Sequence, residues 1–519
     1  MPAPAVPILP GNREASDPIL FRTTAGFIVA ALTASVLLYV WGSLHEASYW
    51  HDEASYLLQA AIFARGRWTA PAPPLPEFFQ QLYLLVSPVF ASKYPPGHAL
   101  LLVPGVLLGL PGLVPLLLSA ATGALVFALG RRLGGPTLGL FGWLIWLGTN
   151  DNLHFRSSYL SEVTTSALWM LGFWALLRWY EEKQQRWLVL AAATVAWQAI
   201  TRPLTAVAYA GPVLVAVAVV VARRKKWREL ALPLGVGCAI LAIIPIWSSR
   251  TTGDWRLTPL MLYTDTYTPW DHPGFGAVTS KPAPRRAPDI MAIDRSFQIQ
   301  HEAHTLAGLP RALAGRANTI RDDMWGKWRV VLVPFALLGL MGLGTVELTA
   351  LAAAVLLVLV YLSYAHPSFW SLYYLELSPV LALLTARGVV RGGAWLPVRW
   401  RRAAFGLGAL ALAVMIPLRA RSVRHSIQAV SGRQQAFEKV LEALPDSRSV
   451  VFVRYAPNHN PHSSLIHNAP FLADAPRWVV YDRGADDARL LRLAPDRVAY
   501  LYDEASGAIW RLPSAPGRP

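Results

Sequence analysis

Five long blocks of this chain contain no Asp, Glu, Lys or Arg, and they restrict the fold more than any other feature of the sequence. The blocks cover residues 24–44, 99–130, 133–150, 203–222 and 230–249. A run of about 18 apolar residues can cross the hydrocarbon layer of a membrane as a helix. Inside that layer only helices and closed barrels satisfy their own backbone hydrogen bonds. Because the runs are continuous rather than alternating, they predict membrane helices and not a barrel.

The chain is therefore predicted to be an all-α polytopic membrane protein of about eleven transmembrane helices, with a small C-terminal α/β domain. Only 15% of its 519 residues are charged, whereas a soluble domain carries about 25%. The first apolar run is longer than the core of a signal peptide and does not end at a small-residue cleavage site, so we interpret it as a retained helix. The predicted spans are 23–44, 113–130, 135–150, 161–178, 187–202, 203–222, 230–249, 329–346, 348–365, 371–388 and 403–420.

Basic residues predict the orientation of these spans. With the amino terminus in the cytoplasm, the cytoplasmic loops hold fifteen Lys and Arg residues, and the short outside turns hold only Arg156 and Arg202. This asymmetry follows the positive-inside rule. It also bears on the apolar stretch 94–112, which Pro and Gly residues interrupt repeatedly. Counting that stretch as a span would place the basic cluster 223–228 outside, so we expect it to lie in the interface instead.

The predicted topology divides the chain into parts. Residues 1–22 form a cytoplasmic segment, and residues 23–420 form the membrane domain. That domain carries two large outside loops, 45–112 and 250–328, and the tail 421–519 also lies outside. We expect the protein in the inner membrane of a bacterium.

The tail alternates one helical pattern, 434–444, with three runs rich in Val, Trp and Tyr at 449–453, 478–481 and 498–502. This alternation predicts a small α/β domain of about 80 residues, near the lower size limit for independent folding. Cys238 is the only cysteine. An intramolecular disulfide is therefore impossible, and an outside domain must be stabilised by its own hydrophobic core.

The formal net charge of +16 raises the question of nucleic-acid binding. Much of the positive charge lies in short loops between apolar runs, where the positive-inside rule explains it. No basic soluble module is visible in the sequence, so we expect no nucleic-acid partner.

An acidic pair, Asp52-Glu53, follows the first span by about eight residues. The sequence after it, from Ala54 to Phe63, has the pattern of an interfacial helix. One interpretation is that Asp52 merely caps that helix. The other is that a carboxylate at this position serves chemistry.

Further polar groups are predicted on the same side of the membrane at a similar depth. Two prolines hold an extended turn after Lys93 and Tyr94. An arginine in a short outside turn needs an anion nearby, which would be a lipid phosphate, Glu162 or a substrate phosphate. The groups are Lys93-Tyr94 with His98, Arg156 with Tyr159 and Glu162, Arg202, and Tyr374 with Glu376.

In this order the motifs resemble the GT-C superfamily of polyprenyl-phosphate-sugar-dependent glycosyltransferases. The branch most similar is that of protein O-mannosyltransferases and lipid A aminoarabinose transferases, and the resemblance covers about residues 20–420. The motifs that carry it are Asp52-Glu53, Lys93-Tyr94-Pro95-Pro96, Arg131-Arg132-Leu133-Gly134-Gly135, Arg156 to Glu162, Thr201-Arg202-Pro203 and Tyr374 to Leu384.

The resemblance implies transfer of a sugar from a polyprenyl-phosphate donor to an extracytoplasmic lipid, glycan or protein, with inversion. Asp52 would be the general base. Glu53 would orient it, bind the acceptor or help to hold a divalent metal, the one cofactor considered. Lys93, Arg156 and Arg202 would stabilise the leaving phosphate. The other substrate-binding candidates are Tyr94, His98, Tyr159, Glu162, Tyr374 and Glu376.

Two alternatives remain open at this point. A transporter or flippase of lipid-linked sugars would share the basic groups. Acids in the middle of spans and inverted repeats would be the features that favour this alternative. A polysaccharide polymerase or ligase would use a large outside loop with essential Arg and His, for which residues 250–328 are available. The three histidines at 459, 462 and 467 are interpreted as polar loop residues, because nothing marks a fourth zinc ligand.

Overall fold

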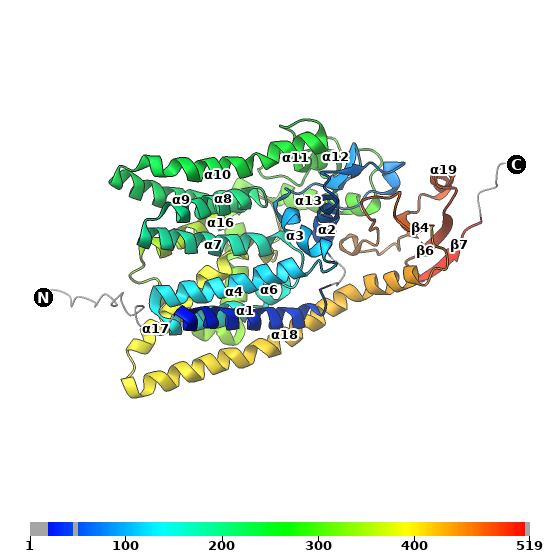
Figure 1. The fold of residues 1–519 in the computed structure, drawn as a ribbon. Coiled ribbons are helices and arrows are strands. Elements are labelled where there is room, and N and C mark those ends of the chain that lie inside the picture. The colour runs from blue at the N-terminus through cyan, green and yellow to red at the C-terminus, as the bar shows by residue number, and fades with distance from the viewer. Residues whose placement is uncertain (1–18, 45–49, 514–519) are drawn as a thin grey trace.

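The computed structural model of the protein describes residues 19–44 and 50–513, so most of the predicted cytoplasmic segment 1–22 lies outside the described residues. The molecule is elongated, with a helical bundle at one end and a mixed head at the other (Figure 1). The bundle is built from α1 (Ile19–Trp41), α4 (Leu113–Gly134), α5 (Pro136–Leu147), α7 (Ser161–Glu182), α8 (Gln185–Ala199), α9 (Pro203–Arg224), α10 (Ala231–Leu241), α15 (Val333–Gly339), α16 (Thr345–Tyr361), α17 (Leu377–Ala394) and the first part of α18 (Val398–Glu442).

The head holds the segments between and after these helices. Where it meets the bundle lie α6 (Asn150–Phe155), α14 (Leu309–Trp325) and α11 (Ile243–Thr252), which continues the bundle helix α10. The rest of the head contains α2 (His51–Ala64), α3 (Gly97–Leu107), α12 (Pro259–Tyr267), α13 (Pro288–Ala303), α19 (Asp487–Leu493), β1 (Ala70–Pro71), β2 (Leu84–Leu85), β3 (Val89–Ser92), β4 (Ser449–Arg454), β5 (Arg477–Tyr481), β6 (Val498–Asp503) and β7 (Ala508–Arg511).

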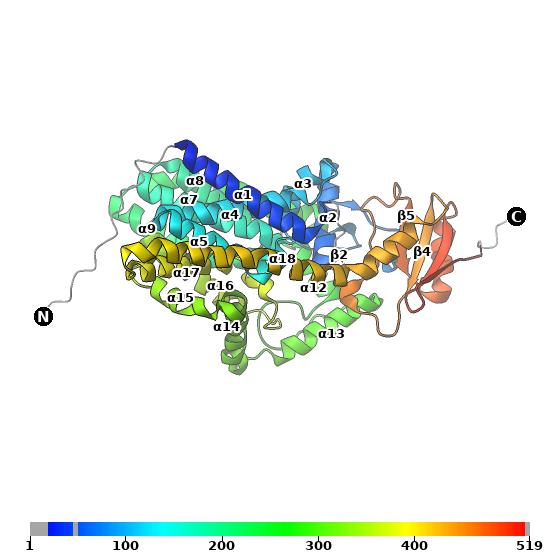
Figure 2. The ribbon, with the colours of Figure 1, turned by 90° about the horizontal axis from the view of Figure 1, so that it is seen from below.

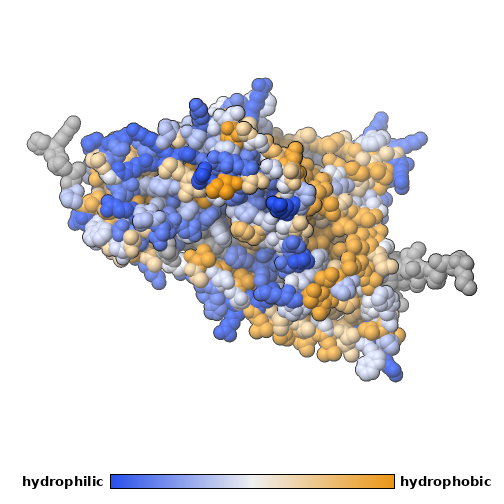
Figure 3. Space-filling view, turned by 180° about the vertical axis from the view of Figure 1, so that it is seen from behind, coloured by the Kyte–Doolittle hydropathy of each residue, from blue (hydrophilic) through white to orange (hydrophobic). Residues whose placement is uncertain are grey.

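The bundle has the surface of a membrane domain. Apolar residues cover it broadly, whereas the head is mostly hydrophilic (Figure 3). Among the described residues, five helices are long and apolar enough to cross a membrane: Thr23–Trp41, Leu113–Gly134, Pro203–Arg224, Trp227–Thr252 and Val398–Gly432. Shorter apolar helices lie between them. The predicted multi-pass helical fold is confirmed, and the number of about eleven spans stays a prediction.

One predicted span differs clearly from the observed helix. In place of 329–346, the structure has the 3₁₀ segment Lys327–Leu332 followed by the seven-residue α15. Glycines let α15 approach α17 closely, since a Cβ at Gly388 would lie 1.7 Å from the carbonyl oxygen of Phe335. This short helix therefore packs backbone against backbone.

The stretch 94–112 is not one continuous helix. Within it α3 covers Gly97–Leu107, and the chain turns at Gly109, whose φ of +68° favours glycine, before α4 begins at Leu113. Eleven residues of helix reach only about 17 Å, which is less than the roughly 30 Å hydrocarbon layer.

The last helix is longer than predicted. The expected span 403–420 and the expected tail helix 434–444 belong to one 45-residue helix, α18. At 1.5 Å per residue it measures about 68 Å, roughly twice the hydrocarbon thickness. It runs along the bundle and continues into the head, where it leads to β4 (Figure 2).

The tail forms the predicted α/β unit around a four-stranded sheet in the order β5-β4-β6-β7. The central strand β4 pairs in parallel with β5 and β6, and β7, which the sequence analysis did not predict, pairs antiparallel with β6. The buried strands account for the continuous apolar runs.

The tail does not keep a core to itself, contrary to the expectation from its size and lack of disulfides. Its strand residues belong to one hydrophobic cluster with residues of α2, of the loop 70–90 and of α12 and α13. Phe452 packs against Phe78, and Trp478 against Phe79, with ring centroids 6.5 and 5.4 Å apart. A unit of about 80 residues buries little surface alone, and sharing a core with the loops compensates for this.

Candidate active site

The acidic pair lies in the first turn of α2, and its two members have different surroundings. Glu53 is 1% exposed, and its carboxylate accepts hydrogen bonds from the backbone N–H groups of Trp50 (3.1 Å) and Tyr159 (2.8 Å). Glu53 thereby caps the amino-terminal end of α2 and joins this helix to the turn before α7. Asp52 is only half-buried and accepts a hydrogen bond from the Tyr94 hydroxyl. The interpretation of Asp52 as a helix cap fails, because Glu53 fills that role.

Lys93 follows β3 and is 3% exposed. Its ammonium lies 2.8 Å from Asp271 and 4.0 Å from the ring centroid of Tyr83. The centroid of the Tyr263 ring lies 5.1 Å from the same ammonium. The other oxygen of Asp271 accepts from the Tyr364 hydroxyl. Lys93 is thus held in an aromatic cage with one carboxylate as its counter-ion.

Tyr83 occupies a backbone conformation that tyrosine seldom adopts, with φ at +67°. Such a residue costs about 1–3 kcal/mol and persists only where its surroundings enforce it. Here the Tyr83 N–H donates to the Tyr263 hydroxyl at 2.9 Å, and its carbonyl accepts from the Lys93 N–H at 2.9 Å. The strained turn holds the ring of Tyr83 under the lysine.

A second cation, Arg202, stands at the start of α9. Its guanidinium pairs with Glu162 and donates to the hydroxyls of Tyr361 (2.9 Å) and Thr205 (3.3 Å). Glu162 is 2% exposed and Arg202 11%. Of the anions considered for this arginine, the structure therefore provides Glu162.

Tyr56 connects the two cation centres. Its ring stacks on Tyr94 at 4.8 Å, and its hydroxyl donates to Ser161 at 2.9 Å. Ser161 precedes Glu162 and lies 3.5 Å from the Arg202 guanidinium. Asp52, Tyr94, Lys93, Glu162 and Arg202 consequently belong to one continuous cluster where the bundle meets the head.

His98 and Tyr159 lie behind this cluster and are fully buried. His98 contacts Thr164 (2.8 Å) and the Tyr159 carbonyl (2.7 Å), which attaches α3 to α7. The Tyr159 ring packs against Trp41. The structure shows them as anchors between elements, and their substrate-binding role stays a prediction.

Arg156 is also completely buried. Its Nε donates to Asn152 at 2.9 Å, and its guanidinium lies 4.8 Å from the Trp146 ring. Both of its terminal nitrogens lack a hydrogen-bond partner among the described residues. Binding of a phosphate by Arg156 stays a prediction.

Glu376 and Tyr374 stand just before α17. Glu376 is 0% exposed and accepts from the Thr165 hydroxyl, which joins α17 to α7. Tyr374 turns to His366, whose Nε2 lies 3.0 Å from its hydroxyl. The Tyr374 ring also lies 6.0 Å from that of Tyr361, a hydrogen-bond partner of Arg202, so Tyr374 borders the cluster on the Arg202 side.

Sequence reasoning missed the counter-ion Asp271 and the tyrosines 83, 361 and 364. Asp271 stands in the turn Trp270-Asp271-His272-Pro273-Gly274, and this dense mixture of aromatic, charged and turn residues inside a long loop was the available signal.

Burial raises the pKa of the Asp52 carboxyl above its ordinary value, while the Tyr94 hydrogen bond and the charge of Lys93 act in the opposite direction. A carboxylate whose pKa moves toward neutrality is a better general base. Both Glu53 oxygens accept from backbone N–H groups, so this carboxylate holds the local fold, and a divalent metal at the acidic pair stays a prediction. No group of three or more His, Cys, Asp or Glu side chains suited to a metal occurs among residues 19–44 and 50–513.

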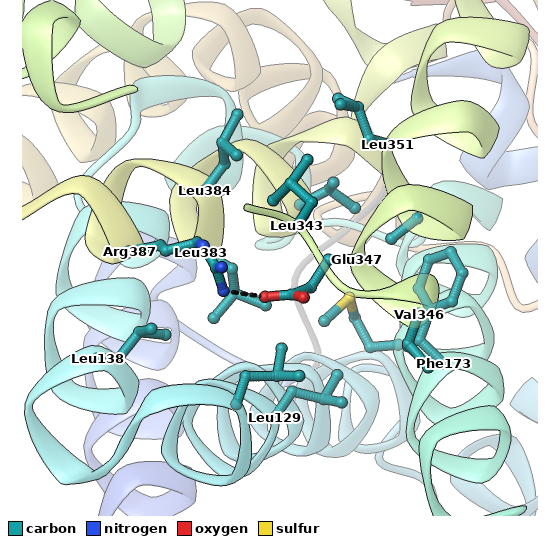
Figure 4. Close-up of a pocket in the computed structure, with 14 residues that line it drawn as sticks. Leu129, Leu138, Phe173, Leu343, Val346, Glu347, Leu351, Leu383, Leu384 and Arg387 are labelled. Carbon is teal, nitrogen blue, oxygen red and sulfur yellow. Dashed lines mark hydrogen bonds and ion pairs between the residues drawn. The ribbon is translucent and has the colours of Figure 1, made fainter. Parts of the chain in front are cut away.

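An apolar pocket opens farther along the bundle (Figure 4). The space between its walls, including the open mouth, is about 620 Å³. Met170 in its wall lies eight residues beyond Glu162, about 12 Å down α7. An ion pair between Glu347 and Arg387 forms part of its lining (Figure 4). The remaining lining is apolar and comes from α4, α5, α7, α16, α17 and Leu343 in the turn before α16.

Comparisons with known proteins identify the architecture. Residues 111–248 match the family model described as dolichyl-phosphate-mannose-protein mannosyltransferase. The crystal structure of ArnT from Cupriavidus metallidurans in the apo state aligns with 92% of this chain and 93% of that chain, at a TM-score of 0.55 and 15% identity. The chain has a GT-C fold. The ArnT structure bound to undecaprenyl phosphate aligns over the same shares at a TM-score of 0.53 and 15% identity.

The fold that the resemblance implied is confirmed, and the family match over residues 111–248 agrees with it. The region that matches the family model includes Arg156, Glu162 and Arg202, and the structural alignment extends over the head as well. No curated protein sequence matches the chain.

Proposed function

We propose that this protein transfers a sugar from a polyprenyl-phosphate donor to an acceptor hydroxyl on the non-cytoplasmic side of the membrane, with inversion. The observation that carries the proposal is the half-buried Asp52 carboxylate, which stands in one cluster with Lys93 and Arg202 at the head end of a GT-C bundle. A base and two phosphate-binding cations are the groups that this reaction needs.

In the proposed reaction the acceptor oxygen attacks the anomeric carbon as its proton passes to Asp52. The bond between the anomeric carbon and the phosphate oxygen breaks, and the electron pair leaves with the polyprenyl phosphate. The phosphate gains negative charge in the transition state, so cations placed beside it accelerate the step. Attack from the face opposite the phosphate inverts the anomeric configuration.

Lys93 and Arg202 supply the positive charge. Without a donor they are neutralised by Asp271 and Glu162, at 2.8 Å for the lysine pair. A buried cation without a counter-ion is destabilising, so these carboxylates keep both side chains in place until a donor phosphate competes for them. Tyr94 orients the base through its hydrogen bond to Asp52.

The apolar pocket suits part of the prenyl chain. Its lining is almost wholly hydrocarbon, and it follows α7 and α17 away from Glu162 and Glu376. An apolar lining favours an apolar ligand over water. The phosphate would then lie at the cluster and the chain would descend along the bundle.

The proposed location is a bacterial inner membrane with the head outside. Fifteen basic residues lie in the predicted cytoplasmic loops or within the helices that border them, and the positive-inside rule assigns that side to the cytoplasm. In this orientation Asp52 is reached only from outside, which excludes cytoplasmic nucleotide sugars as direct donors.

A transfer assay tests the proposal. Purified protein in liposomes receives radiolabelled undecaprenyl-phosphate hexose or pentose, together with membranes of a strain lacking the gene as the source of acceptor. We expect label to leave the lipid-phosphate fraction with time and protein dose, and boiled protein to leave it unchanged. If folded protein releases no sugar from any donor offered, the proposal is wrong.

A further inference from the structure

The loop of the tail that holds three histidines, residues 459–467, is fixed firmly against the rest of the head. The His459 ring lies between two carboxylates, 3.0 Å from Asp289 of α13 and 2.9 Å from Glu504. It also stacks on Tyr455 at 3.6 Å. Asp289 in turn accepts from the Tyr481 hydroxyl at 2.9 Å. These contacts join the loop to an outside segment far away in the sequence.

The tip of this loop reaches the beginning of α2. His462 Nδ1 lies 3.2 Å from His51 Nε2, and the two rings stack with centroids 5.3 Å apart. His51 directly precedes Asp52 and is 6% exposed. Its ring also packs on Tyr83 at 5.7 Å, the tyrosine beneath the Lys93 ammonium. His462 of the tail therefore contacts His51. His51 directly precedes the proposed base Asp52 and also packs against Tyr83 of the aromatic cage around Lys93.

The rest of the tail supports this placement. Arg65 of the α2 segment pairs with Asp474 at 2.7 Å and lies over the Phe471 ring. The shared hydrophobic cluster joins the tail strands to α2, α12 and α13. The tail is thus docked over a broad surface and is not a tethered module.

We infer that the tail completes the candidate active site and that His462 is a positioning residue. The inference rests on the proposed function. His51 and His462 must share one proton at their contact, since one nitrogen donates and the other accepts. This contact holds the His51 ring against Tyr83, and so fixes the first turn of α2 with Asp52 relative to the cage of Lys93. Misplacement by about 1 Å can cost roughly a hundredfold in rate.

Two variants of His462 separate positioning from packing. His462→Ala removes the contact, whereas His462→Asn keeps a polar atom near the place of Nδ1. Full-length His462→Ala should lower kcat about tenfold, a partial loss of orientation, and leave the donor KM within about twofold of wild type. His462→Asn should recover much of that loss. His425→Ala, at an exposed position on α18, is the matched control and should change neither value.

Hydrogen exchange supplies a readout that does not depend on activity. We expect His462→Ala to speed amide exchange in the peptide covering 50–64, while the same peptide in His425→Ala matches wild type. Unchanged exchange, or kinetics equal to the control, would overturn the role of His462. If the wild-type protein transfers no sugar but the exchange result holds, the proposed function fails while the contact itself stands.

Discussion

Glu53→Gln should destabilise the protein although it changes only one atom of the side chain. Glu53 is 1% exposed, and its two oxygens accept from the N–H groups of Trp50 and Tyr159. A glutamine offers one oxygen, so its NH₂ group faces a buried N–H that loses its acceptor, at a cost of about 1–3 kcal/mol. Loss of the charge from the remaining hydrogen bond adds roughly 1 kcal/mol. The free energy of unfolding should therefore fall by about 2–4 kcal/mol.

Thermal unfolding in one detergent and at one scan rate measures this effect. The matched variant is Asp52→Asn, whose amide oxygen still accepts from Tyr94 and whose side chain is only half-buried. We expect Glu53→Gln to melt several degrees below wild type and Asp52→Asn to melt close to it. Equal melting of Glu53→Gln and wild type would refute the assignment of Glu53 as the structural member of the pair.

Three further predictions follow from the structure. Arg202→Lys should regain only part of the transfer lost in Arg202→Ala, because lysine lacks the planar fork that reaches two partners at once; equal kinetics of Arg202→Lys and wild type would mean that only its charge matters. In a background without Cys238, a cysteine at position 460 should react with an impermeant thiol reagent in intact cells and one at position 226 should not; the reverse pattern contradicts the orientation. Burial works against protonation of His459, but Asp289 and Glu504 outweigh it and raise its pKa. Its stabilisation is complete below about pH 6.5 and is lost as the pH rises through the folded-state pKa, so the melting difference between wild type and His459→Gln should shrink from pH 6 to pH 9, and a constant difference would exclude this linkage.

The bundle was predictable because its signal is local. A charge-free run such as 203–222 needs no knowledge of the rest of the chain to be recognised as a membrane helix, and α9 covers Pro203–Arg224. The short α15 was not predictable to the same degree, since its close packing on α17 depends on backbone approach at Gly388. A hydropathy profile identifies the apolar residues of α15 but does not identify α17 as the helix against which they pack.

The candidate site was predictable in the same partial way. Asp52, Lys93 and Arg202 stand out because they are charged residues on the predicted outside, where the short turns hold only two basic residues. Asp271 lies inside a long loop and not in a short turn between spans. Its role depends on a pairing with Lys93, which is 178 residues away in the sequence. The tail loop is a stronger case, because His462 meets His51 across 411 residues, and no local pattern predicts that contact.

The central claim is that Asp52 carries the chemistry of sugar transfer, and the turnover of Asp52→Asn tests it most directly. The control is Asp265→Asn, at an exposed position of α12. With folded protein of unchanged melting temperature, loss of a general base should lower turnover by at least about a hundredfold, while the control keeps the wild-type rate. Near-normal transfer by Asp52→Asn would contradict the account and exclude Asp52 as the base.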